Sequence, residues 1–380
     1  MARKCVERNI AYDDVRRKYY VTMDYGKDTE GKRQKKCVTF PSLTAARRAL
    51  REFEVERANQ MIVVPSKLTF GQWLEQWMKE VIEPNRAETT VYGYRKIIEN
   101  HLDPILGDIV LQELTPRDIQ HYYARLKADK ELSANTIRHH HDLLSCCLRM
   151  AVKQDLILRN PAERVDPPRM LPNEARYYTP ENLSALYRAV EGTWLETVVK
   201  LAGCLGLRRE EICGLRWTNV DFKNRRIQIR EARTAAGASV IQKETKNRSS
   251  SRTLYMTDEI HDVLRREQKR QMENRRALGT VYADSGFVTV NARGEAHSPN
   301  LVSLAFARVI RREGLPKITL HGLRHTFATI ASAQGAPLFD IGKALGHSTP
   351  ATTGKIYTHL LDHTHASTLA KVAAAMEDVS

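Results

Sequence analysis

Five residues of types that can act on a phosphate ester occur in three short stretches in the second half of the sequence. Arg208 lies in GLRREE, and His321 and Arg324 lie three residues apart in LHGLRHTF, where a helix would place them on one face. His347 lies in ALGHSTP, ten residues before Tyr357. Neither an acidic pair nor a Ser-His-Asp order accompanies them, so the pattern does not favour two-carboxylate hydrolysis or a serine nucleophile.

If they converged on a phosphodiester, these side chains could transfer a phosphoryl group without a metal ion. Two guanidiniums can bind nonbridging oxygens and neutralise the charge that develops in the transition state. A histidine can donate a hydrogen bond or move a proton near neutral pH. A tyrosine hydroxyl can attack phosphorus when positive charge or a base promotes its ionisation. Each motif alone also fits a packing or surface role, so the order of the motifs carries the interpretation.

Taken together, the motifs resemble those of one known family. The G-L-R-R-x-E, H-x-x-R, L-G-H and terminal tyrosine elements are similar to those of the tyrosine recombinase (lambda-type integrase) family, especially integrases of temperate phages and of integrative elements such as conjugative transposons. The resemblance implies that Arg208 and Arg324 clamp the scissile phosphate. It also implies that His321 accepts or relays a proton and that His347 hydrogen-bonds a nonbridging oxygen. Tyr357 would be the nucleophile.

The family also carries a lysine on a β-hairpin between its two arginines, and KETKNRSSSRTLYM is similar to that element. Lys246 is the first candidate and Lys243 the second, because Tyr255 stands where the family often has proline and the register is therefore less well fixed. Arg248 and Arg252 either grip the DNA backbone or support the hairpin.

The acidic residue of the first motif is expected to support an arginine. Many relatives carry glycine where this chain has Glu210, and Glu211 takes the place of the family's acidic residue. A carboxylate beside Arg208 would fix the conformation of its side chain, so Glu211 is predicted to act behind the phosphate contact. His325 is interpreted as structural.

The activity implied by the resemblance is site-specific recombination, which integrates and excises a mobile element. Tyr357 would form a 3′-phosphotyrosyl link, and Lys246 would protonate the leaving 5′-oxygen. The 5′-hydroxyl of a partner duplex would then reverse the reaction, and two such exchanges would pass through a Holliday junction. The bond energy stays in the phosphotyrosine, so no cofactor, ATP or metal is expected.

The hydrophobic patterns predict a multidomain, mainly α-helical chain. Residues 1–65 read as strands followed by a helix, and they resemble the family's arm-type DNA-binding domain, a three-stranded sheet plus helix. Residues 66–170 carry four helical patterns and resemble the core-binding (SAM-like) bundle. Residues 171–380 resemble the catalytic domain, which is mostly helical with a small β-sheet and ends in a tail helix. Arg16, Lys18 and Tyr20 share one strand face and are the candidates for contact with arm-type DNA.

The charge balance predicts a polyanionic partner. The chain has 60 Lys and Arg against 45 Asp and Glu, a net charge of +15. The excess lies in residues 1–65 and 171–380, whereas residues 66–170 are neutral, as expected of a protein that bridges arm-type and core crossover sites on double-stranded DNA. The tail helix could pack on its own domain, but the resemblance favours packing in trans within a homo-oligomer, expected to be a tetramer on DNA. Whether excision also needs a helper protein is open.

Other site types and locations receive little support. The six cysteines contain no C-x-x-C pair and are interpreted as reduced. The run His139 to His141 is interpreted as a polar helix face, since consecutive side chains diverge by about 100° and cannot share one ion easily. The chain lacks long apolar runs and a secretory signal, which favours a cytoplasmic protein acting on DNA, without a membrane partner.

Two alternatives use the same residues. A type IB topoisomerase-like enzyme would relax DNA by nicking and religating one strand, although the arm-like segment and the tail argue against it. A non-catalytic architectural DNA-binding protein would keep the fold without the chemistry, although all six catalytic positions are filled here.

Overall fold

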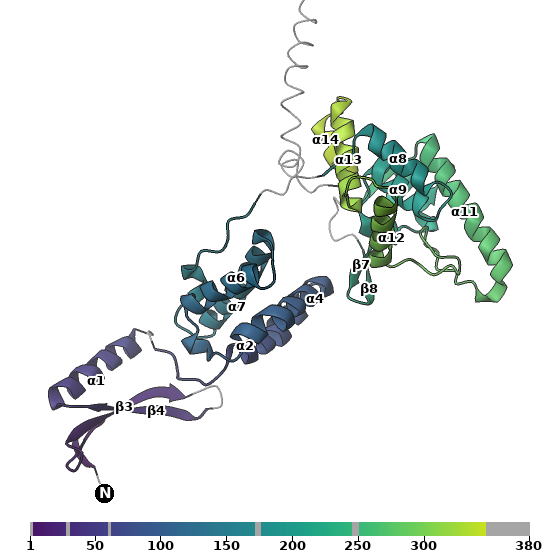
Figure 1. The fold of residues 1–380 in the computed structure, drawn as a ribbon. Coiled ribbons are helices and arrows are strands. Elements are labelled where there is room, and N and C mark those ends of the chain that lie inside the picture. The colour runs from purple at the N-terminus through teal and green to yellow at the C-terminus, as the bar shows by residue number, and fades with distance from the viewer. Residues whose placement is uncertain (1–2, 28–30, 60–61, 172–175, 245–250, 347–380) are drawn as a thin grey trace, which may run out of the picture. The chain divides into compact units, whose positions relative to one another are not determined.

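The structure is a computed structural model of the whole chain, and it describes residues 3–27, 31–59, 62–171, 176–244 and 251–346. The chain divides into two compact units, Met1–Pro172 and Asn173–Ser380 (Figure 1). The mainly helical fold with small antiparallel sheets agrees with the predicted fold class.

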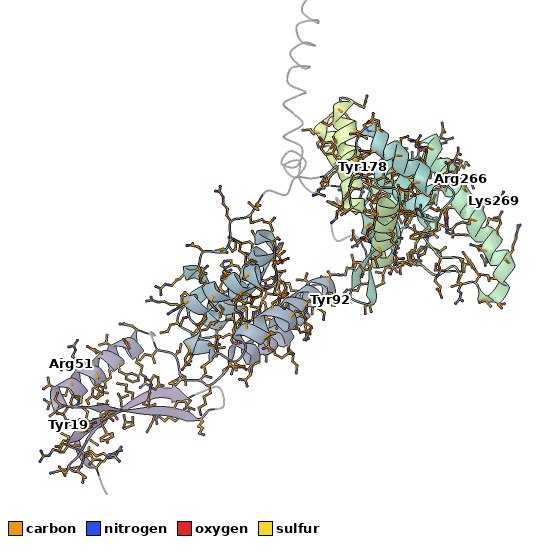
Figure 2. The ribbon with its side chains drawn as sticks, viewed as in Figure 1. Tyr19, Arg51, Tyr92, Tyr178, Arg266 and Lys269 are labelled. Atoms are coloured by element: carbon orange, nitrogen blue, oxygen red, sulfur yellow. The ribbon has the colours of Figure 1, made fainter. Side chains whose placement is uncertain are left out.

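The first unit begins with an antiparallel sheet whose four strands pair in chain order. The strands are β1 Lys4–Glu7, β2 Ile10–Asp13, β3 Lys18–Lys27 and β4 Arg33–Phe40. Helix α1, Leu43–Ala58, begins where the Ser42 hydroxyl accepts a hydrogen bond from the backbone of Ala45 at 3.2 Å. Ile10, Val21 and Ala46 form the core between helix and sheet, and Tyr19 packs against it (Figure 2).

Two sequence expectations for this sheet were wrong. Three strands were expected, but β1 adds a fourth at the edge; its four residues lack the alternation that reveals a strand, and its pairing with β2 is irregular between Cys5 and Glu7. Tyr20 was placed on an open polar face, but its ring is 8% exposed because the Arg3 guanidinium lies 3.7 Å from its centroid. Arg16 and Lys18 are exposed.

The four helical patterns of residues 66–170 form four continuous helical stretches. The first two combine α-helix with a π-helical segment, and the others are uninterrupted: α2, η1 and α3 (Phe70–Trp77, Met78–Ile82, Glu83–Asn85); α4, η2 and α5 (Glu88–Ile97, Ile98–Leu102, Asp103–Leu106); α6 (Pro116–Ala128); and α7 (Ala134–Lys153). A short 3₁₀ turn, η3 (Leu111–Glu113), lies between α5 and α6, and another, η4 (Pro161–Arg164), follows α7. Each π segment directly precedes a turn that contains proline, Pro84 or Pro104. Because proline cannot donate the usual helical bond, the wider turn lets the helix continue.

The core of these helices is rich in aromatic residues. Trp73 and Trp77 of α2 are almost completely buried, and the Trp73 indole donates to the Cys147 carbonyl at 3.3 Å. Thr69 and Thr115 cap α2 and α6 through reciprocal side-chain and backbone bonds. The buried residues of α2, Phe70, Trp73, Leu74 and Trp77, thus form one apolar stripe that faces this core.

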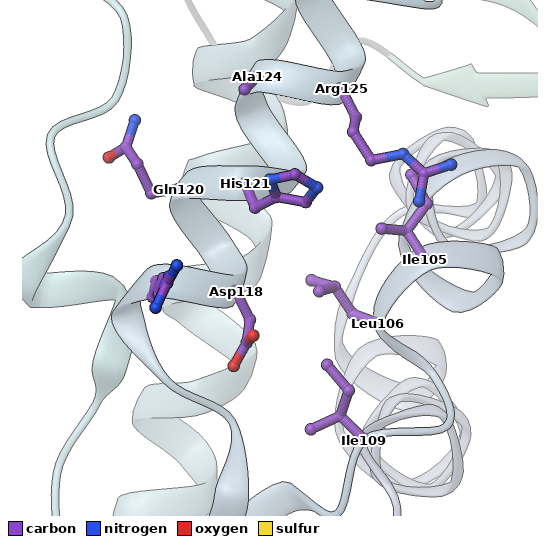
Figure 3. Close-up of a pocket in the computed structure, with 9 residues that line it drawn as sticks. Ile105, Leu106, Ile109, Asp118, Gln120, His121, Ala124 and Arg125 are labelled. Carbon is purple, nitrogen blue, oxygen red and sulfur yellow. The ribbon is translucent and has the colours of Figure 1, made fainter.

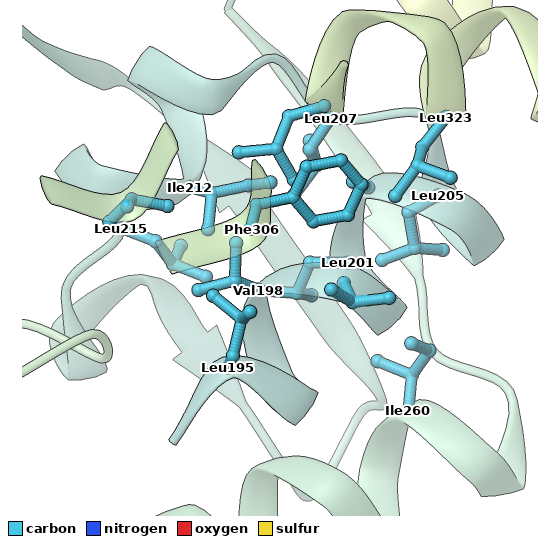
Figure 4. Close-up of a cluster of buried hydrophobic side chains, with 14 of the residues drawn as sticks. Leu195, Val198, Leu201, Leu205, Leu207, Ile212, Leu215, Ile260, Phe306 and Leu323 are labelled. Atoms are coloured by element: carbon cyan, nitrogen blue, oxygen red, sulfur yellow. The ribbon is translucent and has the colours of Figure 1, made fainter. Parts of the chain in front are cut away.

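The second unit is built around α9, Leu195–Leu205, almost all of whose residues are buried. The other elements of this unit are α8 (Pro180–Val190), α10 (Arg209–Gly214), η5 (Trp217–Asn219), β5 (Val220–Asp221), β6 (Arg226–Ile229), β7 (Glu231–Ala236), β8 (Ser239–Glu244), β9 (Arg252–Tyr255), α11 (Asp258–Leu278), η6 (Gly279–Val281), α12 (Pro299–Arg312), α13 (Leu320–Ala333) and α14 (Leu338–Leu345). Val198 and Leu201 of α9 meet Ile212, Phe306 and Leu323 in one cluster (Figure 4).

The strands of this unit form two small antiparallel sheets. One has the order β5-β6-β9, and the other is the β7–β8 hairpin alone. At the surface, Arg266 and Lys269 project from α11 (Figure 2). None of the helices in the described part of the chain is long and apolar enough to cross a membrane.

Two of the three consecutive histidines of α7 are withdrawn from solvent, although the sequence predicts a polar face there. His140 is 2% exposed, and its Nδ1 lies 2.7 Å from the hydroxyl of Tyr122 on α6; His141 pairs with Tyr123 in the same way at 2.8 Å. Of the three, His139 is exposed. Burial, with smaller effects from neighbouring histidines, lowers the pKa of His140 from 6.5 to about 4. The predicted polar face is thus largely a buried hydrogen-bonded seam.

We expect the bundle to lose stability as the pH falls from 6.5 to 4. In this window His140 stays neutral in the folded state but takes up a proton in the unfolded chain, so the free energy of unfolding decreases with falling pH, by about 2 kcal/mol at pH 5. Urea titrations in a Trp194→Phe/Trp217→Phe background would follow the bundle's own tryptophans. His140→Gln should flatten the pH dependence and exposed His139→Gln should not; an unchanged slope in His140→Gln contradicts the assignment.

Candidate active site

Three arginines from distant parts of the second unit meet at the C-terminal end of α14. Nε of Arg252 donates to the carbonyl of residue 344 at 2.7 Å, Nη2 of Arg324 to that of residue 345 at 2.6 Å, and Nη2 of Arg208 to that of Gly346 at 3.4 Å. The last carbonyls of a helix lack intrahelical partners and carry the negative end of its dipole. The C-terminal end of α14 is therefore bound by three arginine side chains. This end directly precedes His347 in the chain.

Gly346 is required at this end for two reasons. Its φ of 67° is a left-handed conformation that suits glycine, and a Cβ there would lie 2.9 Å from Nη1 of Arg252. Gly206 ends α9 in the same way, with φ at 63°, and its carbonyl accepts from Nη1 of Arg324 at 2.7 Å. Arg324, only 2% exposed, is thus held by the carbonyls of two helix ends.

Glu211 joins two of these arginines from behind. Its side chain is 3% exposed, and it accepts hydrogen bonds from the Arg208 backbone at 2.9 Å and from Arg208 Nη1 at 2.8 Å. Both of its oxygens also accept from Arg252 at 2.9 Å. Burial would raise the pKa of Glu211, but the bonds and charges of Arg252 and Arg208 outweigh it and hold the pKa below its usual value. Glu211 is therefore ionised and fixes the Arg208 side chain.

These contacts separate the two roles suggested for Arg252. Its side chain is 7% exposed, with its guanidinium directed at Glu211 and at the α14 carbonyl. Because both terminal nitrogens of Arg252 donate to Glu211, whose carboxylate offsets its charge, the arrangement favours the supporting role over a DNA contact. By contrast, the Arg208 side chain keeps 32% of its surface exposed, so it can reach a ligand.

His321 stands at the edge of this cluster, on the first turn of α13. His321 is exposed to solvent. The centroid of its ring lies 4.8 Å from the centroid of the His325 ring, in an edge-on arrangement. Partial desolvation, followed by the charges of Arg324 and Arg208, lowers the pKa of His321 below its ordinary value. A neutral, accessible imidazole beside two guanidiniums can accept a proton at neutral pH.

The neighbouring Arg209 has other partners than Arg208. It pairs with Glu210 at 2.7 Å and donates to the Ser303 hydroxyl at 2.9 Å, beside a cavity of about 290 Å³ that also borders His321. Residue type alone does not distinguish Arg208 from Arg209, but the N-cap position of Arg208 before α10 directs its side chain to Glu211.

Several predicted residues lie elsewhere. Lys243 lies on β8 opposite Ala232 of β7, near the open end of the hairpin. The predicted Lys246, Arg248, His347 and Tyr357 lie outside the residues that the structure describes. The structure thus brings together Arg208, His321, Arg324 and the supporting Glu211 and Arg252.

The first unit also contains a hollow. It has a volume of about 430 Å³ between α5 and α6, where Ile105 and Ile109 face Asp118, His121 and Arg125 (Figure 3). Arg117 and Arg125 also line it, but none of the motif residues of the sequence does, so the arginine cluster of the second unit remains the candidate catalytic site. Among the described residues no group of three His, Cys, Asp or Glu side chains is arranged to hold a metal ion.

The comparisons with known proteins agree with this arrangement. The sequence profile of the phage integrase family matches residues 176–364, and that of the phage integrase N-terminal SAM-like domain matches residues 69–127. A tyrosine recombinase XerC-like protein of Caldanaerobacter subterraneus is 25% identical over 90% of this chain and 92% of its own length. An integrase of Streptomyces ambofaciens is 26% identical over 92% of this chain and 91% of its own.

Two solved structures show the same fold. The Tn1549 transposon integrase in complex with transposon right end DNA has a TM-score of 0.66 at 22% identity, covering 80% of this chain and 99% of that one. A lambda integrase tetramer bound to a Holliday junction has a TM-score of 0.60 at 17% identity, covering 93% and 96%.

We expect Glu211→Gln to destabilise the second unit strongly. Removing this charge breaks the buried ion pair between Arg252 and Glu211, which costs about 3–5 kcal/mol. The matched control is Glu210→Gln, whose partly exposed pair with Arg209 should contribute less than about 1 kcal/mol. Urea unfolding of both variants measures the difference, and equal small losses would show that Glu211 does not hold the cluster.

Proposed function

Because the chain belongs to the phage integrase family, we propose that it is a site-specific DNA recombinase that integrates and excises a mobile element. The observation that carries the proposal is the convergence of Arg208, Arg324 and a neutral His321 at the end of α14. This set provides two guanidiniums for one phosphate and an accessible proton acceptor beside them.

In the proposed cleavage step a bond forms between the Tyr357 oxygen and the scissile phosphorus, while the bond from phosphorus to the 5′-oxygen breaks. The tyrosine proton passes to His321, whose lowered pKa keeps the ring neutral and able to accept it. Arg208 and Arg324 bind the nonbridging oxygens, and His347 donates a further hydrogen bond to them. A hairpin lysine, Lys246 or Lys243, gives a proton to the leaving oxygen.

Rejoining follows from the same chemistry. The 5′-hydroxyl of a partner duplex attacks the phosphotyrosine, the tyrosine leaves, and each proton returns along its path. Two successive exchanges pass through a Holliday junction, and the phosphotyrosyl bond conserves the energy of the broken phosphodiester. The reaction therefore needs no nucleotide hydrolysis.

The remaining parts of the chain fit this activity as DNA-binding domains. We propose that residues 66–170 and 171–380 hold the core crossover site and that residues 1–65 bind arm-type DNA. Four exposed cations supply positive charge for phosphate contacts there: Arg16 just before β3, Lys18 at the start of β3, and Lys35 and Lys36 of β4. Arg248, beyond the end of β8, is proposed as a further backbone contact.

Assembly follows from the need to exchange strands between two duplexes. The relatives of the same fold include a lambda integrase tetramer bound to a Holliday junction. We propose that this chain also acts as a tetramer on DNA, joined by exchange of its C-terminal tail, and that excision can draw on a helper protein.

We expect a covalent protein–DNA adduct that depends on Tyr357. Nicked suicide duplexes with a randomised segment would be incubated with the protein, and the DNA that stays attached on a denaturing gel would be sequenced and resynthesised as the cognate duplex. Wild type and the control Tyr255→Phe, which changes an exposed tyrosine of β9, should form the adduct, whereas Tyr357→Phe should form none.

The same duplex separates recombination from simple relaxation. Joining of two marked duplexes identifies a recombinase, while relaxation of a supercoiled circle without joining would indicate a topoisomerase-like enzyme. An adduct of equal yield in Tyr357→Phe, or none in wild type, contradicts the proposal.

A further inference from the structure

The β7–β8 hairpin is tied to the rest of the second unit by the side chain of Arg216. Nε of this arginine donates to Glu231 of β7 at 3.1 Å, and Nη2 donates to Gln242 of β8 at 3.3 Å. Its remaining terminal nitrogen, Nη1, donates to the carbonyl of Ser285 at 3.3 Å. One guanidinium therefore joins both strands of the hairpin to a separate segment of the chain.

An aromatic ring strengthens this connection. Phe287 is 7% exposed and pairs with Arg216 in an isolated β-bridge. The guanidinium carbons of Arg216 and of Arg233, a residue of β7, lie 4.2 and 4.7 Å from the centre of this ring. Arg233 also donates to the carbonyl of His297 at 3.1 Å. Stacking on a largely desolvated ring fixes the planes of both guanidiniums.

The hairpin also touches α10 without intervening side chains. A Cβ on Gly214, at the end of α10, would lie 2.9 Å from Cα of Ala232 and 2.9 Å from the carbonyl oxygen of Glu231. The same short helix begins directly after Arg208 and contains Glu211. The elements that hold the phosphate-binding arginine and the hairpin are thus packed backbone to backbone, with Arg216 two residues further on.

We propose that Arg216 is a positioning residue, which sets the β7–β8 hairpin at a fixed distance from the phosphate-binding arginines so that the hairpin lysine meets the leaving 5′-oxygen. This inference rests on the proposed function. An isolated two-stranded hairpin is only marginally stable, so its orientation depends on such attachments. When the bond to the 5′-oxygen breaks, the lysine ammonium gives up one proton and the 5′-oxygen gains it, and a displaced hairpin would slow that transfer.

Replacing the bridging 5′-oxygen with sulfur isolates this step. A thiol ionises near pH 8.5, far below an alcohol, so the sulfur leaves as a thiolate and needs no proton. A residue that acts through the lysine matters for the oxygen duplex but not for the sulfur duplex. A residue that binds DNA or only maintains the fold affects both duplexes alike.

The experiment measures covalent cleavage of the two suicide duplexes by the full-length protein and its variants. We expect Arg216→Gln to cleave the oxygen duplex roughly 10- to 100-fold more slowly, as a misplaced catalytic group does, and to cleave the sulfur duplex near the wild-type rate. Arg226→Gln is the matched control, because Arg226 is exposed on β6 in the neighbouring sheet, and it should cleave both duplexes normally. Phe287→Leu serves as a second, milder variant if thermal unfolding shows that Arg216→Gln does not fold.

Each other outcome has a definite meaning. Equal losses on both duplexes, or no loss on either, overturn the positioning role of Arg216. Lys246→Ala and Lys243→Ala are measured alongside. The lysine that protonates the leaving oxygen is the one whose alanine variant cleaves the oxygen duplex slowly but the sulfur duplex at the wild-type rate. If neither variant regains the wild-type rate on the sulfur duplex, the inference fails while the recombinase proposal stands. If wild type forms no Tyr357-dependent adduct with either duplex, the proposed function itself fails.

Discussion

The arrangement of the second unit depends on the unpaired carbonyls at the C-terminal end of α14. The last carbonyls of a helix need hydrogen-bond donors from outside the helix. Here three arginines donate to three consecutive carbonyls, those of residues 344, 345 and 346. Arg252 comes from the strand after the hairpin, Arg324 from α13 and Arg208 from the turn before α10, so the contact joins segments far apart in sequence. The same helix end directly precedes His347 in the chain, and Tyr357, the proposed nucleophile, follows ten residues later.

Gathering three cations is favourable only if their mutual repulsion is compensated. The buried Glu211 neutralises one charge and orients two of the arginines, and the helix carbonyls solvate the rest. The Arg208 side chain nevertheless keeps 32% of its surface exposed, so its guanidinium stays accessible to a ligand. In the proposed reaction a phosphate would bind this exposed guanidinium, and the contacts that stabilise the cluster would also orient it toward DNA.

Sequence patterns predicted most of the elements and the members of the arginine cluster. The four helical patterns of residues 66–170 are confirmed, since capping residues and periodicity are local signals. Edge strand β1 was missed because it buries too little to leave a pattern. Spacing along the chain does not encode contacts between distant segments. Three such contacts were therefore not predicted: Arg3 with the Tyr20 ring, His140 with Tyr122, and Arg216 with the β7–β8 hairpin.

The central claim is that Arg208 acts on the charge of the scissile phosphate. The most direct measurement compares cleavage by wild type and Arg208→Ala of two otherwise identical duplexes, one with the natural phosphate and one with an uncharged methylphosphonate at that position. The account predicts a loss on the order of 10²–10³-fold for Arg208→Ala on the phosphate and a much smaller loss on the methylphosphonate, where little negative charge needs stabilisation. Equal losses on the two duplexes would contradict it.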